Sequence, residues 1–303
     1  MKKMKNSSLF LFGIFVAFTF AACDEITGPY TEEVNVTEGG RKILLEDFTG
    51  HECGNCPYAG IEATKLDSIY KGRVIVVATH CSFFADTNKT GKFSYNFKTP
   101  VGDELDQFFN IETAGLPKGM VNRQANDGDY TIFSNRLLNY TAWGSSIAME
   151  LNKKAAVNLS ISKNYDTLNR NLNLDIEVEY LEKGNINQQL VVYLVEDSII
   201  NWQKWYGHIP ENVPDFAHRH VFRKSLNGAW GDRLSGSVKS VGQIISKSFA
   251  PLSQAIFAVS INHLPTKPVP PVSRTRDPLS WFIALTKRVK WSSVSFKLKF
   301  RTM

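Results

Sequence analysis

The pattern of apolar and polar positions changes once along the chain, near residue 154. Before that point, residues 43–45 and 74–78 form continuous apolar runs, which are typical of strands buried on both faces. Residues 60–70 lie between these runs and carry apolar side chains at helical spacing, and Gly72 follows as a helix end. A strand, a helix and a second strand in this order predict the opening unit of an α/β domain with a parallel sheet.

After residue 154 the apolar positions recur at every second residue. Residues 157–161 and 172–180 alternate between apolar and polar side chains, as strands with one solvated face do. Residues 183–185 form a turn signal, and residues 190–195 read as a strand buried on both faces. The second part of the chain therefore predicts an antiparallel β-sandwich domain.

Two cysteines mark the turn between the first predicted strand and the helix. Cys53 and Cys56 are separated by two residues, so their sulfur atoms can meet within one turn. The unpaired N–H groups of a helix start stabilise a thiolate on the first of them. Pro57 fits this position because its missing N–H would be unpaired there anyway. We therefore interpret Cys53 and Cys56 as a redox pair.

The residues around this pair resemble a known active-site region. Asp47 lies six residues before Cys53, as a buried Asp does in thioredoxin. The stretch FTGHECGNCP at residues 48–57 is closer still to the thioredoxin-like lipoproteins of the outer membrane protein 28-related family, and residues 218–231 resemble a second region of that family. The resemblance implies an α/β thioredoxin-like domain followed by the antiparallel β-sandwich domain. It implies a fold more firmly than a reaction, because the family's biochemical role is poorly defined.

The resemblance also implies roles for four residues. Cys53 would be the attacking thiolate and Cys56 the resolving thiol, while Asp47 would assist proton transfer to and from Cys56. Pro117 fits, by order and distance, the cis-proline that faces the C-x-x-C and shapes the substrate groove. Leu116 departs from the Thr, Val or Ile often found before that proline. Taken alone, Pro117 reads as a turn proline in a trans peptide.

Two further residues are candidate modulators of this pair. His51, two residues before Cys53, would lower the pKa of that thiol if the imidazole is close and charged. We interpret Cys81 as a half-buried free thiol, and exchange with the active pair is an alternative. A second alternative is a zinc site formed by the active pair together with Cys81 and His80, although zinc would block the redox pair.

A pair of histidines in the second part of the chain gives weaker evidence for a binding site. His218 and His220 would share one face of an extended segment, and such a pair could bind a metal. We favour packing and surface hydrogen bonding for both side chains. The sequence therefore predicts no metal and no other cofactor.

The N-terminus has the features of an export signal. Lysines stand at positions 2, 3 and 5, residues 9–22 are apolar and too few to span a bilayer, and two alanines precede Cys23. The position of Cys23 resembles a bacterial lipoprotein cleavage site, which would make it the lipidated first residue. The alternative is an ordinary signal peptide with a bystander cysteine. We expect outer membrane lipid as a partner through Cys23, in the cell outer membrane facing the periplasm or the exterior.

Charge is placed unevenly along the 303 residues. The formal net charge is +6, but the segment from His263 onward carries nine Lys and Arg against one acidic residue, Asp277. The remainder is close to neutral, so no distributed basic surface for nucleic acid is predicted. The basic tail does not read as the last strands of a sandwich. Two hypotheses for it are a shifted reading frame or foreign extension, and a segment lying on anionic lipid.

These patterns predict five successive segments. They are a signal peptide at residues 1–22, a polar tether at 23–40, a thioredoxin-like domain at 41–153, a β-sandwich domain at 154–261 and an atypical basic tail at 262–303.

Two functions fit this organisation. The first is an exported lipoprotein that carries out thiol–disulfide exchange with the thiols or disulfides of exported proteins. The second is a non-catalytic surface lipoprotein that uses both domains as a binding scaffold, with Cys53–Cys56 as a structural bridge.

Overall fold

The computed structural model describes residues 30–35, 40–70, 72–129, 131–166, 171–253 and 257–262. The predicted signal peptide, Cys23 and the basic tail from residue 263 lie outside these residues. The strands are β1 (Tyr30–Asn35), β2 (Ile43–Thr49), β3 (Val74–His80), β4 (Lys118–Val121), β5 (Val157–Asp166), β6 (Asn171–Tyr180), β7 (Gln189–Glu196), β8 (Ile199–Lys204), β9 (Asn212–His218), β10 (Val221–Ser225), β11 (Asp232–Arg233), β12 (Ile244–Ser253) and β13 (Phe257–Asn262). The α-helices are α2 (Cys56–Ile69), α3 (Pro100–Phe109), α4 (Ile111–Ala114) and α5 (Trp143–Leu151), with short 3-10 turns at Phe83–Ala85, Phe133–Arg136 and Tyr140–Ala142.

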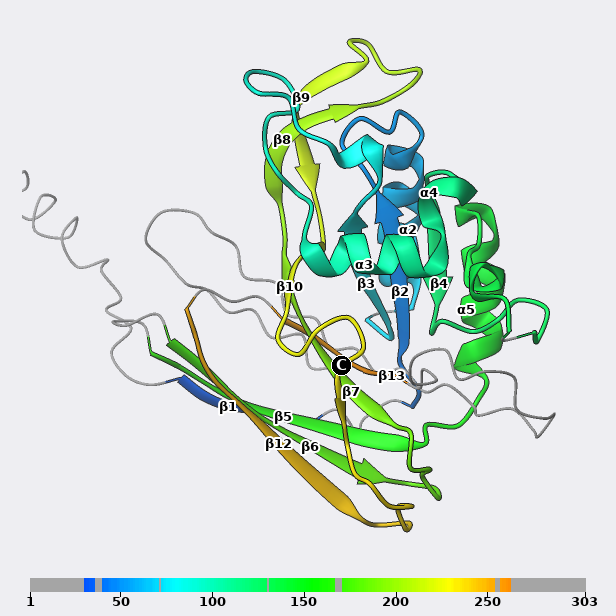
Figure 1. Cartoon of the computed structure of the whole chain (residues 1–303), viewed down its shortest axis with the longest axis vertical. Helices are drawn as coiled ribbons and strands as arrows, with labels where there is room; N and C mark the ends of the chain where they lie inside the picture. The colour runs from blue at the N-terminus through cyan, green and yellow to red at the C-terminus, as the bar shows by residue number, and fades with distance from the viewer. Residues whose placement is uncertain are drawn as a thin grey trace, which may run out of the picture.

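A mixed sheet, in which β2 lies next to the edge strand β4, organises the molecule. Its strand order is β11-β7-β10-β3-β2-β4, and β13 pairs with β7 outside this path. Strand β2 is parallel to β3 and antiparallel to β4. All side chains of β2 and β3 are buried, as their continuous apolar runs predict, because other elements cover both faces of these strands. Figure 1 shows α3 lying across the sheet, with the four-stranded sheet at one end of the molecule and the β8–β9 hairpin at the other.

Alternate residues of β2 face different cores. Ile43 and Leu45 pack with apolar residues of α2 and α5, whereas Leu44 packs with residues of β7 and β10. Phe48 joins the cluster under α3, which also contains Leu105. The strand is therefore fixed from both sides, and its C-terminal end is held where the C-x-x-C turn begins.

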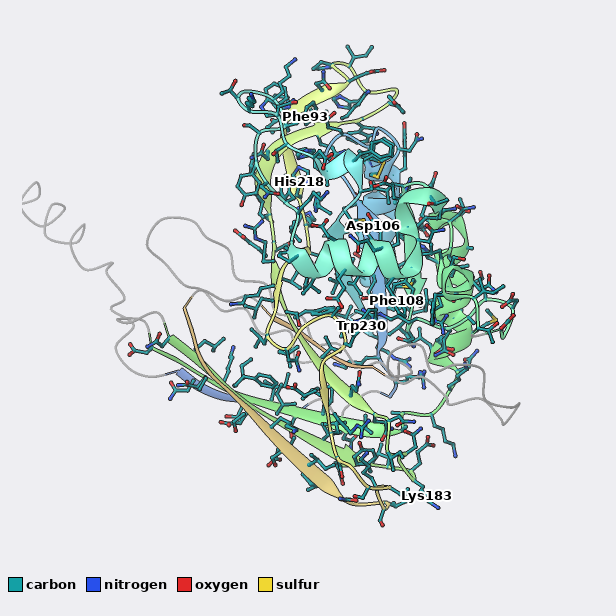
Figure 2. All side chains as sticks on the ribbon, in the orientation of Figure 1. Phe93, Asp106, Phe108, Lys183, His218 and Trp230 are labelled. Atoms are coloured by element: carbon teal, nitrogen blue, oxygen red, sulfur yellow. A yellow bond between two sulfur atoms is a disulfide. The ribbon has the colours of Figure 1, made fainter. Side chains whose placement is uncertain are left out.

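The α3 face of the sheet is closed by aromatic residues. The rings of Phe108 and Trp230 lie 4.4 Å apart between centroids, and Figure 2 labels both below the helix. The Trp230 indole N–H donates to the Glu104 carboxylate over 2.6 Å. These contacts attach the chain after β10 to a helix that lies more than a hundred residues earlier in the sequence.

The mixed sheet crosses the boundary predicted between residues 153 and 154. Strand β10 pairs with β3, and β7 pairs antiparallel with β10, so both strands extend the thioredoxin-like sheet. A separate β-sandwich domain is therefore not confirmed. The fold class is mixed α/β and largely β, with a mixed sheet and antiparallel sheets.

The alternating strands form a second, four-stranded sheet in the order β1-β5-β6-β12. Its inward side chains, among them Leu174 and Ile176, share a core with Leu190 and Val192 of β7. Strand β7 therefore serves both layers, which explains why its six residues from Leu190 to Val195 are all buried.

Strand β1 lies within residues 23–40, the segment predicted as a polar tether. Tyr30–Asn35 pairs antiparallel with β5. A strand at a sheet edge is held by main-chain hydrogen bonds and needs no apolar period, so its polar sequence gave no strand signal. Among the described residues, no helix has both the length and the apolar character needed to cross a bilayer.

A buried ion pair between Glu46 of β2 and Arg123 also contacts β7. Arg123 donates to both carboxylate oxygens of Glu46, at 2.6 and 2.5 Å, and to the Tyr193 hydroxyl at 3.0 Å. Burial alone would lower the Arg123 pKa, but the Glu46 charge more than offsets it and the pKa is raised. The Arg123 guanidinium therefore keeps its charge although it is buried.

We expect Glu46→Gln to destabilise the protein by about 3–5 kcal/mol, because it leaves a buried guanidinium charge without its counter-ion. The free energy of unfolding in urea measures the loss. The surface pair Lys65–Glu62 provides the control, since Glu62→Gln should cost less than about 1 kcal/mol. Equal small losses in the two variants would show that the buried pair does not stabilise the sheet.

Candidate functional site

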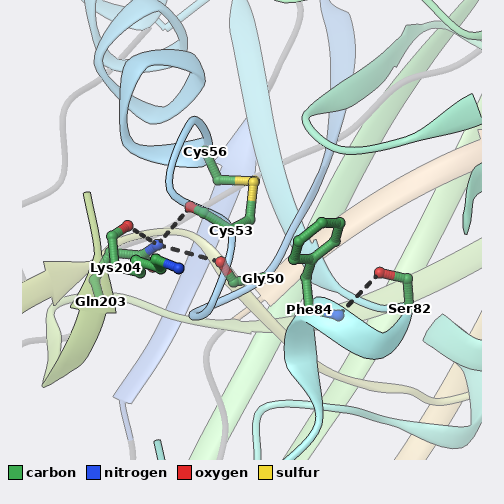
Figure 3. Close-up of a disulfide and its surroundings, with 7 residues drawn as sticks. All are labelled: Gly50, Cys53, Cys56, Ser82, Phe84, Gln203 and Lys204. Atoms are coloured by element: carbon green, nitrogen blue, oxygen red, sulfur yellow. Dashed lines mark hydrogen bonds between the residues drawn. A yellow bond between two sulfur atoms is a disulfide. The ribbon is translucent and has the colours of Figure 1, made fainter. Parts of the chain in front are cut away.

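The C-x-x-C turn is built between the end of β2 and the start of α2. Cys56 is the first residue of the helix, Asn55 is its N-cap and Pro57 occupies the first turn, as predicted. Cys53 and Cys56 form a disulfide with their Cα atoms 5.3 Å apart, shown in Figure 3. The prediction that these two sulfurs meet at the strand–helix corner is confirmed. Both are bonded to each other, so neither is free as a zinc ligand.

The disulfide is covered by the β8–β9 hairpin. Cys53 is 2% exposed and Cys56 is 3% exposed. The Lys204 N–H donates to the His51 carbonyl, and the Tyr206 N–H donates to the Gly54 carbonyl, each over 2.8 Å. The extended chain of residues 204–206 is thus bonded to the main chain on both sides of Cys53.

Gln203 fixes the same loop from the side. Its buried amide N–H₂ group donates to the carbonyl of Gly50 at 3.2 Å and to the carbonyl of Cys53 at 3.1 Å, as Figure 3 shows. A third contact, to the Lys204 carbonyl at 2.8 Å, holds the amide against its own strand. One side chain therefore bridges β8 and the two ends of the Gly50–Cys53 turn, which leads into the C-x-x-C segment.

Tyr206 lies directly on the turn. A Cβ atom added to Gly54 would come within 2.5 Å of the Tyr206 ring, so only glycine permits this contact. The Tyr58 hydroxyl of α2 donates to the Tyr206 carbonyl over 2.7 Å. The ring and the main chain of Tyr206 together close the outer side of the disulfide loop.

Pro117 occupies the loop before β4. The Leu116–Pro117 peptide bond is cis, as the resemblance implies. Lys118, the next residue, pairs with Phe48 near the end of β2. The cis-proline loop thus lies beside the strand end that leads into the C-x-x-C turn.

Asp47 lies behind the disulfide, within a cavity of about 470 Å³ that Cys56 also lines. Its side chain is buried, and its Oδ1 atom has no hydrogen-bond partner among the described residues. Burial without a compensating charge raises the pKa of Asp47 to about 7. The carboxyl is therefore able to hold or release a proton near neutral pH, on the side of Cys56.

His51 does not supply the positive charge that the sequence interpretation required. Its imidazole is buried, and its Nε2 atom lies 2.8 Å from the Asp86 carbonyl oxygen. Burial lowers the pKa of His51 below its ordinary value of 6.5, so the ring is neutral at pH 7. A neutral imidazole does not stabilise a thiolate through charge.

Cys81 is a free thiol, but it is fully buried rather than half-buried. It lies in the apolar cluster under α3, and burial raises its pKa well above the ordinary value. Its neighbour His80 points to the other face of β3, where it lines the cavity. Side chains alternate across a strand, so Cys81 and His80 are separated by the sheet.

The two histidines of the second part of the chain both line the cavity, yet they do not share a strand face. His218 ends β9 and lies 3.2 Å from the Trp202 carbonyl through Nε2, while burial lowers its pKa to about 4. His220 has a φ of 55°, which breaks the extended geometry assumed for the pair. No group of three or more potential ligands able to hold a metal exists among the described residues.

Gln203 and Tyr206 escaped the sequence analysis. The sequence patterns assigned no strand to residues 199–218, which form the β8–β9 hairpin. The aromatic content of this segment was the available signal. Nothing in the local sequence indicates that a glutamine 150 residues from Cys53 would donate to its carbonyl.

We expect Asp47→Asn to remove a pH-dependent loss of stability. The folded carboxyl keeps its proton up to about pH 7, whereas the unfolded one ionises near 3.8, so unfolding free energy falls as the pH rises between these values. The variant should therefore gain stability relative to the parent across this range, by at most about 4 kcal/mol.

Urea unfolding of both oxidised proteins at several pH values measures this difference. His80 and His218 have lowered pKa values and weaken the fold as the pH falls, in the opposite direction. Subtracting the parent curve from the variant curve removes their contribution. A difference that is constant between pH 4 and pH 8 would contradict the prediction.

Residues 104–254 match the family described as "Outer membrane protein Omp28". This match supports the resemblance that the sequence indicated, and the family's description is that of an outer membrane protein. No curated protein matches the chain significantly.

Two solved structures are similar to this fold. HBP35 of Porphyromonas gingivalis has a TM-score of 0.53 at 18% sequence identity, and the match covers 74% of this chain and 70% of that one. This likeness shows the fold alone. A protein of Agrobacterium tumefaciens with a known X-ray structure has a TM-score of 0.42 at 14% identity, covering 74% of this chain and 87% of that one, and no argument rests on it.

Proposed function

We propose that this Omp28-related chain carries out thiol–disulfide exchange on exported proteins of the cell envelope. The observation that carries the proposal is the Cys53–Cys56 disulfide at the start of α2, with the buried Asp47 carboxyl on the same cavity as Cys56. The cis-Pro117 loop beside the end of β2 adds to this arrangement. Thiol–disulfide exchange requires a thiolate and a disulfide, and the Cys53–Cys56 pair supplies the disulfide.

In the oxidising direction, a substrate thiolate attacks the sulfur of Cys53 and breaks the disulfide. Cys56 leaves as a thiolate and takes up a proton, for which Asp47 is the nearby donor because its pKa is about 7. A second substrate thiolate then attacks the substrate sulfur of the mixed disulfide and releases the Cys53 thiolate. The substrate has lost two electrons to the cysteine pair, and the reducing direction uses the same steps in reverse.

We further propose that Cys23 carries a lipid anchor that holds the chain at the outer membrane. The support is the sequence itself, in which an apolar segment and two alanines precede Cys23. Each buried CH₂ of an acyl chain contributes about 0.8 kcal/mol to membrane binding. Such an anchor would keep the redox site among proteins of the envelope.

One observation favours a different function. Both sulfurs are almost fully buried and the hairpin is bonded across them, as in a structural bridge. The chain would then be a surface binding lipoprotein, and recognition would fall to the hairpin and the sandwich-like packing of the two sheets. At the hairpin Ile209 is 94% exposed and Tyr206 is 43% exposed, so apolar surface is available for a partner.

An insulin reductase assay with dithiothreitol distinguishes the two functions. We expect the parent protein to accelerate insulin precipitation, and Cys53→Ser to lose at least about 100-fold of that rate because insulin can no longer form a mixed disulfide at residue 53. Cys81→Ala is the control, since this thiol lies on the other side of the sheet and should leave the rate unchanged.

Equal rates of insulin precipitation for Cys53→Ser and the parent would contradict the proposed exchange function. The reduction potential of the pair gives an independent measure. A value well below about −300 mV would identify a structural bridge and favour the binding function.

A further inference from the structure

The two cysteines of the disulfide differ in their surroundings. Cys53 lies under the hairpin and does not line the cavity, whereas Cys56 forms part of the cavity wall. The sequence resemblance assigns the first contact with a substrate to Cys53. In this structure, however, Cys56 is the cysteine of the pair that lines the cavity.

The cavity lies between α2 and the end of β9. One wall is the helix face with Gly60 and Thr64, and the opposite wall contains Phe216 and His218. Its volume of about 470 Å³ falls within the range of small-molecule sites, about 300–1,000 Å³. A folded protein cannot enter a space of this size, but a molecule of a few to about twenty atoms can.

The inner end of the cavity carries polar groups that the described protein leaves unsatisfied. Both ring nitrogens of His80 and the Oδ1 atom of Asp47 are buried without a hydrogen-bond partner. Each of these residues is more than nine-tenths buried and lines the cavity. Buried polar groups without partners are costly, so this end of the cavity is suited to a polar ligand or to water that accompanies it.

We propose that the cavity admits a low-molecular-weight thiol to Cys56, while the closed hairpin keeps folded protein thiols away from Cys53. This inference rests on the proposed function and adds a second substrate class to the same disulfide. Small thiols would exchange from the cavity side without any movement of the hairpin. Protein partners would exchange at Cys53 after residues 204–206 leave the turn.

The exchange with a small thiol balances as follows. A small thiolate attacks the sulfur of Cys56, an S–S bond forms between them, and Cys53 leaves as a thiolate. A second small thiolate attacks the sulfur of the first and releases the Cys56 thiolate. The products are a small-molecule disulfide and a reduced cysteine pair, and the two electrons come from the two thiols.

Gly60→Phe tests whether small thiols reach Cys56 through the cavity. Gly60 lines the cavity, and a Cβ atom added there meets no atom within 4 Å, so a side chain can be introduced at this wall. We expect the rate at which L-cysteine reduces the disulfide to fall at least tenfold. Alkylation of the released thiols followed by peptide mass spectrometry measures the rate.

The control is Gly236→Phe, which introduces the same side chain at an exposed glycine with no atom within 4 Å and away from the cavity. Its rate with L-cysteine should equal that of the parent. Should Gly60→Phe fail to fold, Thr64→Phe occupies the same wall and carries the same expectation. An unchanged rate in a folded cavity-filling variant would overturn the inference.

Variants that keep only one cysteine of the Cys53–Cys56 pair identify the sulfur that small molecules reach. Treated with cystine, Cys56 in the Cys53→Ser protein should form its mixed disulfide at least tenfold faster than Cys53 in the Cys56→Ser protein. Faster modification of Cys53 would place the entrance on the hairpin side and overturn the inference.

Reduced thioredoxin, a protein dithiol, separates failure of the inference from failure of the proposed function. If neither L-cysteine nor reduced thioredoxin reduces the parent protein, the exchange function itself fails. If both reduce it and the cavity-filling variants react like the parent, the proposed exchange function is supported. Access of small thiols to Cys56 through the cavity is then contradicted. Reduction by L-cysteine that is slowed only by the cavity-filling variants supports the inference.

Discussion

Main-chain hydrogen bonds between the C-x-x-C turn and the β8–β9 hairpin are the constraint on which the site depends. The carbonyls of His51 and Gly54 would otherwise be exposed at a short loop, and the N–H groups of residues 204 and 206 would need water. Pairing them satisfies both segments at once. The same pairing buries the disulfide, so the chemistry of the sulfurs and the position of a distant hairpin are coupled.

Burial also sets the protonation of the groups around the disulfide. The pKa of Asp47 rises and the pKa values of His51, His80 and His218 fall, and in each case desolvation is the largest cause. All of these changes favour the neutral form. At neutral pH the three imidazoles are therefore neutral, and Asp47 is the member of this group of four that is closest to changing its state.

The strands and the helix around the C-x-x-C turn could be predicted, because each has its own pattern of apolar positions or residue types. The apolar runs of β2 and β3, the helix between them and the Pro57 start all follow from spacing and residue type. The placement of β7 could not be predicted, because a strand buried on both faces has the same sequence whether it lies in a sandwich or in a mixed sheet. The contact of Gln203 with Cys53 depends on tertiary pairing that no local period records.

The continuity of the mixed sheet limits how the chain can be divided. A fragment ending at residue 153 would keep β2, β3 and β4 but lose β10, which pairs with β3. The edge of β3 would then present free N–H and C=O groups beside a row of apolar side chains, which is a template for joining the strands of separate molecules. The two halves of the sequence are in this sense interdependent, and the second half protects the first from self-association.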